Sequence, residues 1–152
     1  MNYYIKNTRI GKYMVLGSRF REFGFFKVDL KENINKLDSS TKWKINLVSE
    51  INGESIYRIV NSDEETFLID SYGPVIAGQD YTMKEITASL EEYVGKLNLY
   101  FSAVQQKNSY RIFSVDKRFA LFAYNFSEES ERPCMMSGYI GDPDIWLLEE
   151  AA

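Results

Sequence analysis

The sequence contains one short pattern, Tyr-x-Ile, that recurs at close to a third of the chain length. Its three copies begin at Tyr3, Tyr57 and Tyr110, so they lie 54 and 53 residues apart in a chain of 152. Self-similarity at a fixed period indicates a protein built from repeated structural units. The sequence therefore predicts a single domain made of three copies of one unit, at about 1–52, 53–106 and 107–152.

Each copy of the pattern is followed by similar segments. A short polar loop and a second apolar segment predict a β-hairpin, and a third apolar segment and an aromatic closing strand complete the unit. Short strands at this spacing favour an all-β barrel or sandwich, and the threefold period selects a β-trefoil of twelve strands in three pseudo-symmetric four-strand repeats. The expected strands are 3–7, 12–16, 25–28 and 43–47, then 57–61, 66–69, 74–77 and 99–103, then 110–114, 118–122, 134–139 and 146–148.

One segment of the second unit differs from the strand pattern. Thr82 and Glu85 have the spacing of a capping box, and the apolar residues that follow fall on one helical face up to Val94. The pattern predicts a short helix or structured loop over 82–94, as an insertion in the longest connection of that unit.

Composition narrows the class of protein. With 45% hydrophobic and 15% aromatic residues, a chain of 152 can bury a sizeable core without disulfides, and Cys134 is its single cysteine. A net charge of -4 disfavours nucleic acid as a partner. No run approaches the length of a membrane span, and the N-terminal residues lack the pattern of a secretion signal. We expect a cytoplasmic protein.

The residue types also limit the chemistry. The chain has no histidine, so neither a Ser-His nor a Cys-His nucleophile pair can form, and the commonest zinc ligand is missing. The acidic groups at 63–65 and 128–131 lie in turn-like sequence and are expected to be solvated. We expect a protein that is not an enzyme, with no cofactor and no metal site.

Several residues have structural explanations. Trp43 and Trp146 occupy matching positions and are expected to fill the barrel core, together with the three repeated tyrosines. Cys134 is expected to be a small buried hydrophobic residue. Residues 141–144 predict a turn before the last strand, with the aspartates supplying turn geometry.

The repeated residues resemble two branches of the β-trefoil superfamily, the ricin-B-like lectins and the fungal protease inhibitors. The resemblance rests on Tyr3, Ile5, Asn7, Gly11, Tyr13, Trp43 and Ile45, and residues 73–78 are also similar to a segment of the mycocypin inhibitors. These are residues that build the barrel, so they specify the fold more closely than the function. The resemblance implies a binding protein whose partner is a serine or cysteine protease or, alternatively, a glycan.

Each inhibitor type implies its own contact residues. Resemblance to the mycospins implies a loop between the second and third strands of the first unit, where Arg19 or Arg21, with Phe20 between them, would meet a trypsin-like pocket. Resemblance to the mycocypins implies Arg9 facing a papain-like cleft and Asn61 facing an asparagine-specific protease. The alternative is that the arginines are solvated loop charges.

The lectin alternative implies a different site. Ricin-type sugar sites use Gln-x-Trp and an aspartate on the second strand, whereas this chain has Thr41-Lys42-Trp43 and Asp144-Ile145-Trp146 at the first motif. At the aspartate position it has Val15, Ile69 and Leu121. A sugar would therefore bind elsewhere, on an exposed aromatic ring. A third hypothesis is a receptor ligand that acts through a surface patch.

Overall fold

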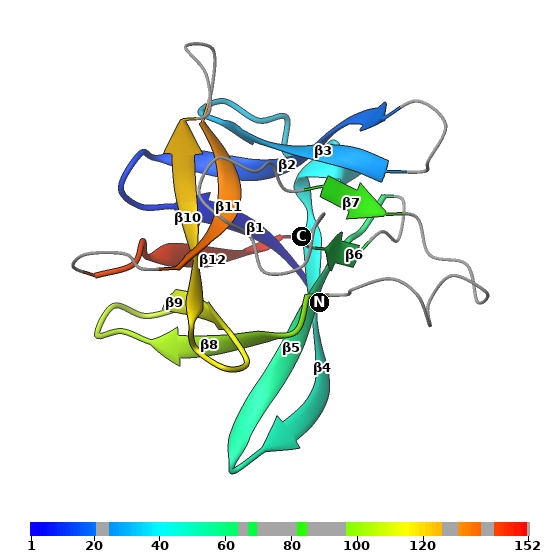
Figure 1. Ribbon diagram of the computed structural model, residues 1–152. Helices are drawn as coiled ribbons and strands as arrows, with labels where there is room; N and C mark the ends of the chain where they lie inside the picture. Colours follow the sequence, from blue (N-terminus) through cyan, green and yellow to red (C-terminus); the bar gives the residue numbers. More distant parts are fainter. Residues whose placement is uncertain are drawn as a thin grey trace.

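The computed structural model describes residues 1–20, 25–63, 67–69, 82–84, 97–125, 131–137 and 142–151. Within these ranges the chain forms twelve strands and one 3-10 turn, η2 (Ser39–Thr41), so the fold is all-β (Figure 1). No helix in the described ranges has the length and apolar character needed to cross a membrane. The strands are β1 (Asn2–Asn7), β2 (Lys12–Phe20), β3 (Phe25–Lys31), β4 (Trp43–Ile51), β5 (Glu54–Asn61), β6 (Phe67–Ile69), β7 (Thr82–Lys84), β8 (Leu99–Ala103), β9 (Ser109–Ser114), β10 (Phe119–Asn125), β11 (Glu131–Ser137) and β12 (Trp146–Ala151).

Six of these strands close into a ring. The order is β1, β4, β5, β8, β9, β12 and back to β1, and every neighbouring pair is antiparallel. The first and last strands lie side by side, paired from Asn2 with Ala151 to Asn7 with Trp146. Closure of the ring gives each of its strands a partner on both sides, which removes the open edges of a flat sheet.

The other six strands form three pairs attached to the ring. β2 and β3 extend from β1, β6 and β7 from β5, and β10 and β11 from β9. β3 also pairs with β7, and in Figure 1 the β4–β5 hairpin extends away from the three pairs. A six-stranded ring with three attached hairpins is the β-trefoil, the fold that the repeat predicts.

The second unit departs from the expected pattern at its third strand. Residues 82–84 form β7, so the expectation of a helix beginning at Thr82 is wrong. They pair with β3 on one side and β6 on the other, and these ladders override the local capping pattern. The expected strand at 74–77 and the rest of the expected helix, 85–94, lie outside the described residues.

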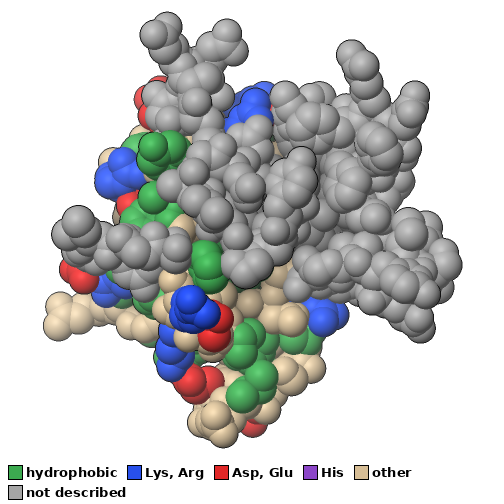
Figure 2. All heavy atoms as spheres, in the orientation of Figure 1, with side chains coloured by type: hydrophobic (Ala, Val, Ile, Leu, Met, Phe, Trp, Pro, Cys, Tyr) green, Lys and Arg blue, Asp and Glu red, His purple; other side chains and the backbone are tan. Residues whose placement is uncertain are grey.

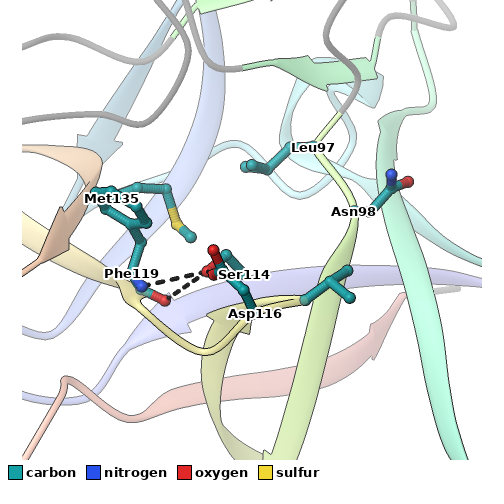
Figure 3. Close-up of a pocket in the computed structure, with 7 residues that line it drawn as sticks. Leu97, Asn98, Ser114, Asp116, Phe119 and Met135 are labelled. Carbon is teal, nitrogen blue, oxygen red and sulfur yellow. Dashed lines mark hydrogen bonds between the residues drawn. The ribbon is translucent and has the colours of Figure 1, made fainter. Parts of the chain in front are cut away.

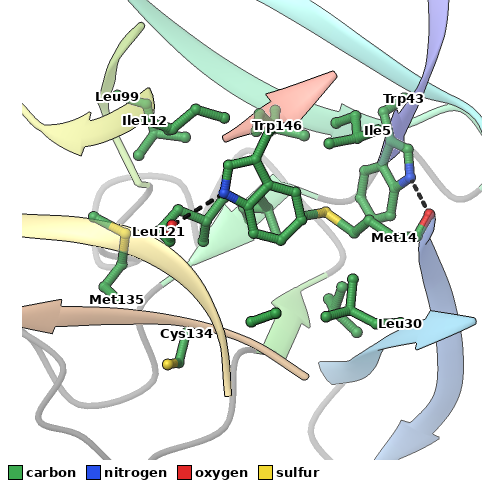
Figure 4. Close-up of a cluster of buried hydrophobic side chains, with 14 of the residues drawn as sticks. Ile5, Met14, Leu30, Trp43, Leu99, Ile112, Leu121, Cys134, Met135 and Trp146 are labelled. Carbon is green, nitrogen blue, oxygen red and sulfur yellow. Dashed lines mark hydrogen bonds between the residues drawn. The ribbon is translucent and has the colours of Figure 1, made fainter. Parts of the chain in front are cut away.

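The core confirms the threefold pattern of the sequence. Ile5, Ile59 and Ile112 are fully buried, and they come from the three copies of Tyr-x-Ile. Trp43 and Trp146 are also fully buried, as expected, and Figure 4 shows both indole rings within the apolar cluster. The indole N–H groups donate to the carbonyl oxygens of Met14 at 2.8 Å and of Leu121 at 3.0 Å, so neither ring leaves a buried donor unpaired. Cys134 is buried as well.

Candidate functional site

Each ring strand places one side chain in a layer at one end of the barrel. Successive side chains on a strand alternate between its two faces, so a residue two positions from a core residue shares the inward face. Tyr3, Tyr57 and Tyr110 stand two residues before the buried isoleucines, and on the closing strands Ile45, Phe101 and Leu148 stand two residues after Trp43, Leu99 and Trp146. Five of these side chains are partly buried and Leu148 is buried, with 8% of its surface exposed. All six line a cavity of about 450 Å³, which we call the barrel-mouth pocket.

Aromatic packing holds the pocket in shape. The Phe101 ring packs edge-to-face against Tyr57, with ring centroids 5.4 Å apart, and against Tyr110, with centroids 5.7 Å apart. Edge-to-face geometry aligns the positive edge of one ring with the negative face of the next, which favours this fixed arrangement. The three rings therefore form a preorganised wall of the pocket.

A carboxylate lies at the rim of this pocket. Lys117 donates to the two carboxylate oxygens of Glu54 at 2.9 and 2.7 Å, and its ammonium lies 4.6 Å from the centre of the Tyr100 ring. Glu54 and Tyr100 both line the pocket. The hydrogen bond from Lys117 holds the pKa of Glu54 below its ordinary value, so the rim carries a carboxylate anion at neutral pH.

The charges around the ring are mixed in sign. On the face shown in Figure 2, basic and acidic side chains lie next to one another among apolar ones in the lower part of the molecule. Among the described residues, no group of three or more Asp, Glu or Cys side chains lies close enough together to hold a metal ion.

The structure places Arg9 in a network rather than on a free loop. In the β1–β2 loop, Arg9 donates to Asp144 through Nε at 2.8 Å and Nη2 at 3.0 Å, and to the Ala123 carbonyl. Asp144 also accepts from Asn7 Nδ2 and from the Ala123 N–H, each at 2.9 Å. Burial raises the pKa of Asp144, but the hydrogen bonds from Arg9, Ala123 and Asn7 outweigh it and leave the pKa below its ordinary value.

Asn61 is a buried structural residue. Its side chain is fully inaccessible, and Nδ2 donates to the Ser40 carbonyl at 3.0 Å. Its Oδ1 accepts from the Asp63 N–H at 2.9 Å, which holds the start of the β5–β6 connection. A protease would reach this side chain only after the connection opened.

The remaining inhibitor candidates lie at the end of β2. Arg19 and Phe20 are its last two residues, and their backbones pair with Phe26 and Phe25 of β3. Arg21 belongs to the segment 21–24, outside the described residues. Among the described residues the predicted contacts therefore do not form one cluster, since Arg9 is bonded to Asp144 and Asn61 lies beneath the surface.

The positions that form the sugar site in ricin-type lectins hold buried side chains in this chain. Val15 and Leu121, which stand where the sugar-binding aspartate is expected, are buried in the core. Thr41 and Asp144, which stand at the glutamine position of Gln-x-Trp, are also buried, and Asp144 is ion-paired with Arg9. The barrel-mouth pocket was not among the sites expected from sequence, although the repeated tyrosines that line it were recognised as a set.

Comparison with known proteins supports the fold. No protein-family model matches the chain, and no curated protein sequence matches it. Among solved structures, the designed threefold-symmetric protein ThreeFoil aligns over 98% of each chain with 14% identity and a TM-score of 0.67. The agglutinin of Rhizoctonia solani aligns over 98% of this chain and 94% of its own, with 15% identity and a TM-score of 0.68.

A third solved structure carries a sugar. The ricin B-like lectin of Macrolepiota procera, determined in complex with lactose, aligns over 99% of this chain and 95% of its own, with 12% identity and a TM-score of 0.65. At these identities the likeness establishes the β-trefoil fold alone.

Proposed function

We propose that this protein is a non-catalytic carbohydrate-binding protein and that the barrel-mouth pocket receives a sugar ring. The observation that carries the proposal is the cavity of about 450 Å³ that combines aromatic walls with a carboxylate at its rim. Small-ligand sites are typically cavities of roughly 300 to 1,000 Å³ with apolar walls and a few polar groups. An aromatic face suits the apolar face of a pyranose ring.

The polar groups of the pocket suit sugar hydroxyls. Glu54 is acceptor-only while it is ionised, so a hydroxyl of the ligand can donate to it. The phenol groups of Tyr57 and Tyr110 can both donate and accept, and Ser55 adds another hydroxyl to the lining. The hydrogen bond from Lys117 lowers the pKa of Glu54, which makes this carboxyl a poor general acid near neutral pH.

The comparison with the lactose-bound lectin supports a sugar ligand but not the same site. That lectin has the same fold and holds lactose. In the present chain two of the ricin-type aspartate positions are the buried residues Val15 and Leu121. The proposal therefore uses the shared fold and a pocket at a different place on it.

A titration with sugars tests this proposal. We expect saturable binding of a monosaccharide or disaccharide from a broad panel, followed by calorimetry and by shifts of the Tyr57 and Phe101 amide resonances. Replacing Glu54→Gln should weaken that binding at least about tenfold, equivalent to about 1.4 kcal/mol. Glu50→Gln, an exposed position on the neighbouring strand, is the matched control and should bind as the parent does. Equal affinity of parent and Glu54→Gln, or no binding across the panel, would exclude the pocket as a sugar site.

Protease inhibition is a second candidate, favoured by the pairing of β2 with β3. The two strands remain paired up to Phe20 and Phe25, so the connection 21–24 starts and ends on strands fixed to the barrel. An inhibitory loop has to lose little conformational entropy when a protease cleft closes around it, and anchored ends contribute to this. Arg19 and Arg21 are then the residues for a trypsin-like pocket.

Residual protease activity tests the inhibitor candidate. Trypsin, chymotrypsin, papain and an asparagine-specific protease would each be incubated with stoichiometric protein, and the protein would be checked for cleavage. Inhibition of trypsin that is lost in Arg19→Ala or Arg21→Ala, and kept in the exposed control Arg118→Ala, would establish this function. Full residual activity of all four enzymes would exclude it for these protease classes.

A further inference from the structure

The three units meet at three equivalent junctions. The closing strand of each unit begins with Trp43, Leu99 or Trp146, and the register pairs these residues with Asn61, Ser114 and Asn7, the last residues of β5, β9 and β1. The residue two positions before each closing strand completes the junction. We name the junctions by their principal polar residue: the Asp144 junction (Asn7 and Asp144), the Asn61 junction (Thr41 and Asn61) and the Ser114 junction (Leu97 and Ser114).

Two of these junctions are filled by polar side chains. At the Asp144 junction, Asn7 Nδ2 donates to Asp144 at 2.9 Å. At the Asn61 junction, Asn61 Nδ2 donates to the Ser40 carbonyl at 3.0 Å. A backbone hydrogen bond of 3.0 Å seals each one: the Thr8 N–H donates to Ile145 in the first, and the Ser62 N–H donates to Lys42 in the second.

The Ser114 junction is built differently. Serine replaces the buried asparagine and Leu97 replaces the polar partner, so the asparagine amide of the other two junctions has no counterpart at these two positions. The equivalent backbone positions are Val115 and Asn98, and among the described residues no hydrogen bond joins them. A cavity of about 400 Å³, the junction pocket, lies here (Figure 3).

The walls of the junction pocket are apolar and its rim is polar. Leu97, Val115, Phe119 and Met135 line it, and Figure 3 shows Leu97 across the pocket from Phe119 and Met135. Asp116 is at the rim, where its Oδ1 accepts from the Ser114 hydroxyl at 2.6 Å and from the Arg118 N–H at 3.0 Å. These bonds hold the pKa of Asp116 below its ordinary value, so it offers an ionised acceptor.

We propose that the junction pocket binds a small aromatic molecule that carries a hydrogen-bond donor, of the phenol or indole type. The volume of about 400 Å³ lies within the range of small-ligand sites. An aromatic ring can pack edge-to-face against Phe119, and the Met135 thioether makes a favourable sulfur contact with such a ring. The O–H or N–H of the ligand donates to Asp116. The site is separate from the barrel-mouth pocket and does not depend on sugar binding.

The repeat itself supplies the variant that tests this site. Ser114→Asn places in this junction the side chain that the other two junctions already hold, so it should narrow the pocket next to Asp116, where the donor of the ligand would lie. Ser102→Asn makes the same change on the neighbouring strand β8, at a residue that does not line the pocket. Val115→Phe, which adds a ring at another residue that lines the pocket, serves as a second filling variant if Ser114→Asn does not fold by circular dichroism.

Nuclear magnetic resonance titrations with phenol and indole, with cyclohexanol as the non-aromatic control, measure the binding. We expect saturable shifts of the Val115, Asp116 and Phe119 amides with both aromatic probes. Affinity should fall at least tenfold in the filling variant and stay unchanged in Ser102→Asn. The proposal is overturned by an absence of saturable shifts, by shifts confined to the barrel-mouth amides of Tyr57 and Phe101, by equal affinity in the filling variant, or by equal affinity for cyclohexanol.

Discussion

The Asp144 junction and the Ser114 junction lie at equivalent places in the fold and are built in opposite ways. In the first, a buried carboxylate accepts hydrogen bonds from Arg9, Asn7 and the Ala123 backbone. In the second, Leu97 stands in place of the carboxylate, and a cavity of about 400 Å³ remains. The same ring of strands accommodates both a fully bonded polar closure and an open apolar space.

The two junctions serve different purposes: the Asp144 junction stabilises the fold, and the Ser114 junction leaves room for a ligand. A buried carboxylate is costly unless hydrogen bonds and a countercharge match it, and Asp144 has both. It links the loop after the first strand to the last unit, across the place where the two ends of the chain meet. An unfilled apolar space forgoes packing energy, so the Ser114 junction contributes less to stability and leaves room for a ligand.

The largest effect is expected from Asp144→Ala. The change leaves the Asn7 amide and the Ala123 N–H without their acceptor in a buried place, and it removes the countercharge of Arg9. Each buried polar group left unsatisfied costs about 1 to 3 kcal/mol, so losing the acceptor of both groups should cost about 3 to 5 kcal/mol in total. Urea denaturation followed by circular dichroism measures the free energy of unfolding.

Asp142→Ala is the matched control for this variant. Asp142 lies two residues away and its side chain is 85% exposed, so its loss should change the free energy of unfolding by less than about 0.5 kcal/mol. If Asp144→Ala cost no more than Asp142→Ala, the polar closure would not be what holds the first and last units together.

Acid should weaken the Asp144 junction. The folded protein holds the pKa of Asp144 below its ordinary value of 3.8, so the unfolded chain takes up this proton first as the pH falls. The contribution to stability is therefore complete above about pH 3.8 and is lost as the pH drops through the lower folded value. Unfolding free energies measured from pH 5 downward should fall less steeply in Asp144→Asn than in the parent. Parallel slopes would assign the acid sensitivity to other carboxylates, such as Asp116 or Glu131.

Asn61→Ser gives the Asn61 junction the residue that the Ser114 junction has at the equivalent position. It removes the donor to the Ser40 carbonyl and the acceptor for the Asp63 N–H, so two partly buried polar groups lose their partner. We expect a loss of about 2 kcal/mol in the free energy of unfolding, since each unsatisfied buried group costs about 1 to 3 kcal/mol. Asn46→Ser, at an exposed position on β4, is the control and should be nearly neutral.

The sequence was sufficient to predict the ring and most of the hairpins. Inward positions recur every two residues along a ring strand, and the strands themselves recur after about one third of the chain. The three copies of Tyr-x-Ile show both periods. The failure at Thr82 has a physical reason, because pairing of β7 with β3 and β6 is non-local, whereas a capping box is a local signal.

The two pockets and the Asp144 network were not predictable in the same way. Asp144 was interpreted as a turn residue because its partners, Arg9 and Ala123, are distant in the sequence. Its position two residues before Trp146, matching Thr41 before Trp43, was the signal that could have placed it inside. The change to Ser114 is visible in the sequence, where Ser114 follows Tyr110 at the spacing at which Asn7 follows Tyr3 and Asn61 follows Tyr57. The cavity is not visible there, because it depends on how Leu97, Phe119 and Met135 pack around this position.

The smallest effect is expected from Arg9→Ala, and it separates the structural role of this residue from an inhibitory one. Arg9 donates to Asp144 twice, but 54% of its side chain is exposed, so water can replace part of what is lost. Asp144 also keeps its hydrogen bonds from Asn7 and the Ala123 N–H, so we expect a cost of about 1 kcal/mol, well below that of removing Asp144. In a double-mutant cycle the two changes should be far from additive, because Arg9 has no carboxylate to bind once Asp144 is absent. Additive costs would mean that Arg9 stabilises the fold through the Ala123 carbonyl alone. Papain inhibition lost in Arg9→Ala at unchanged stability would assign Arg9 to a protease contact.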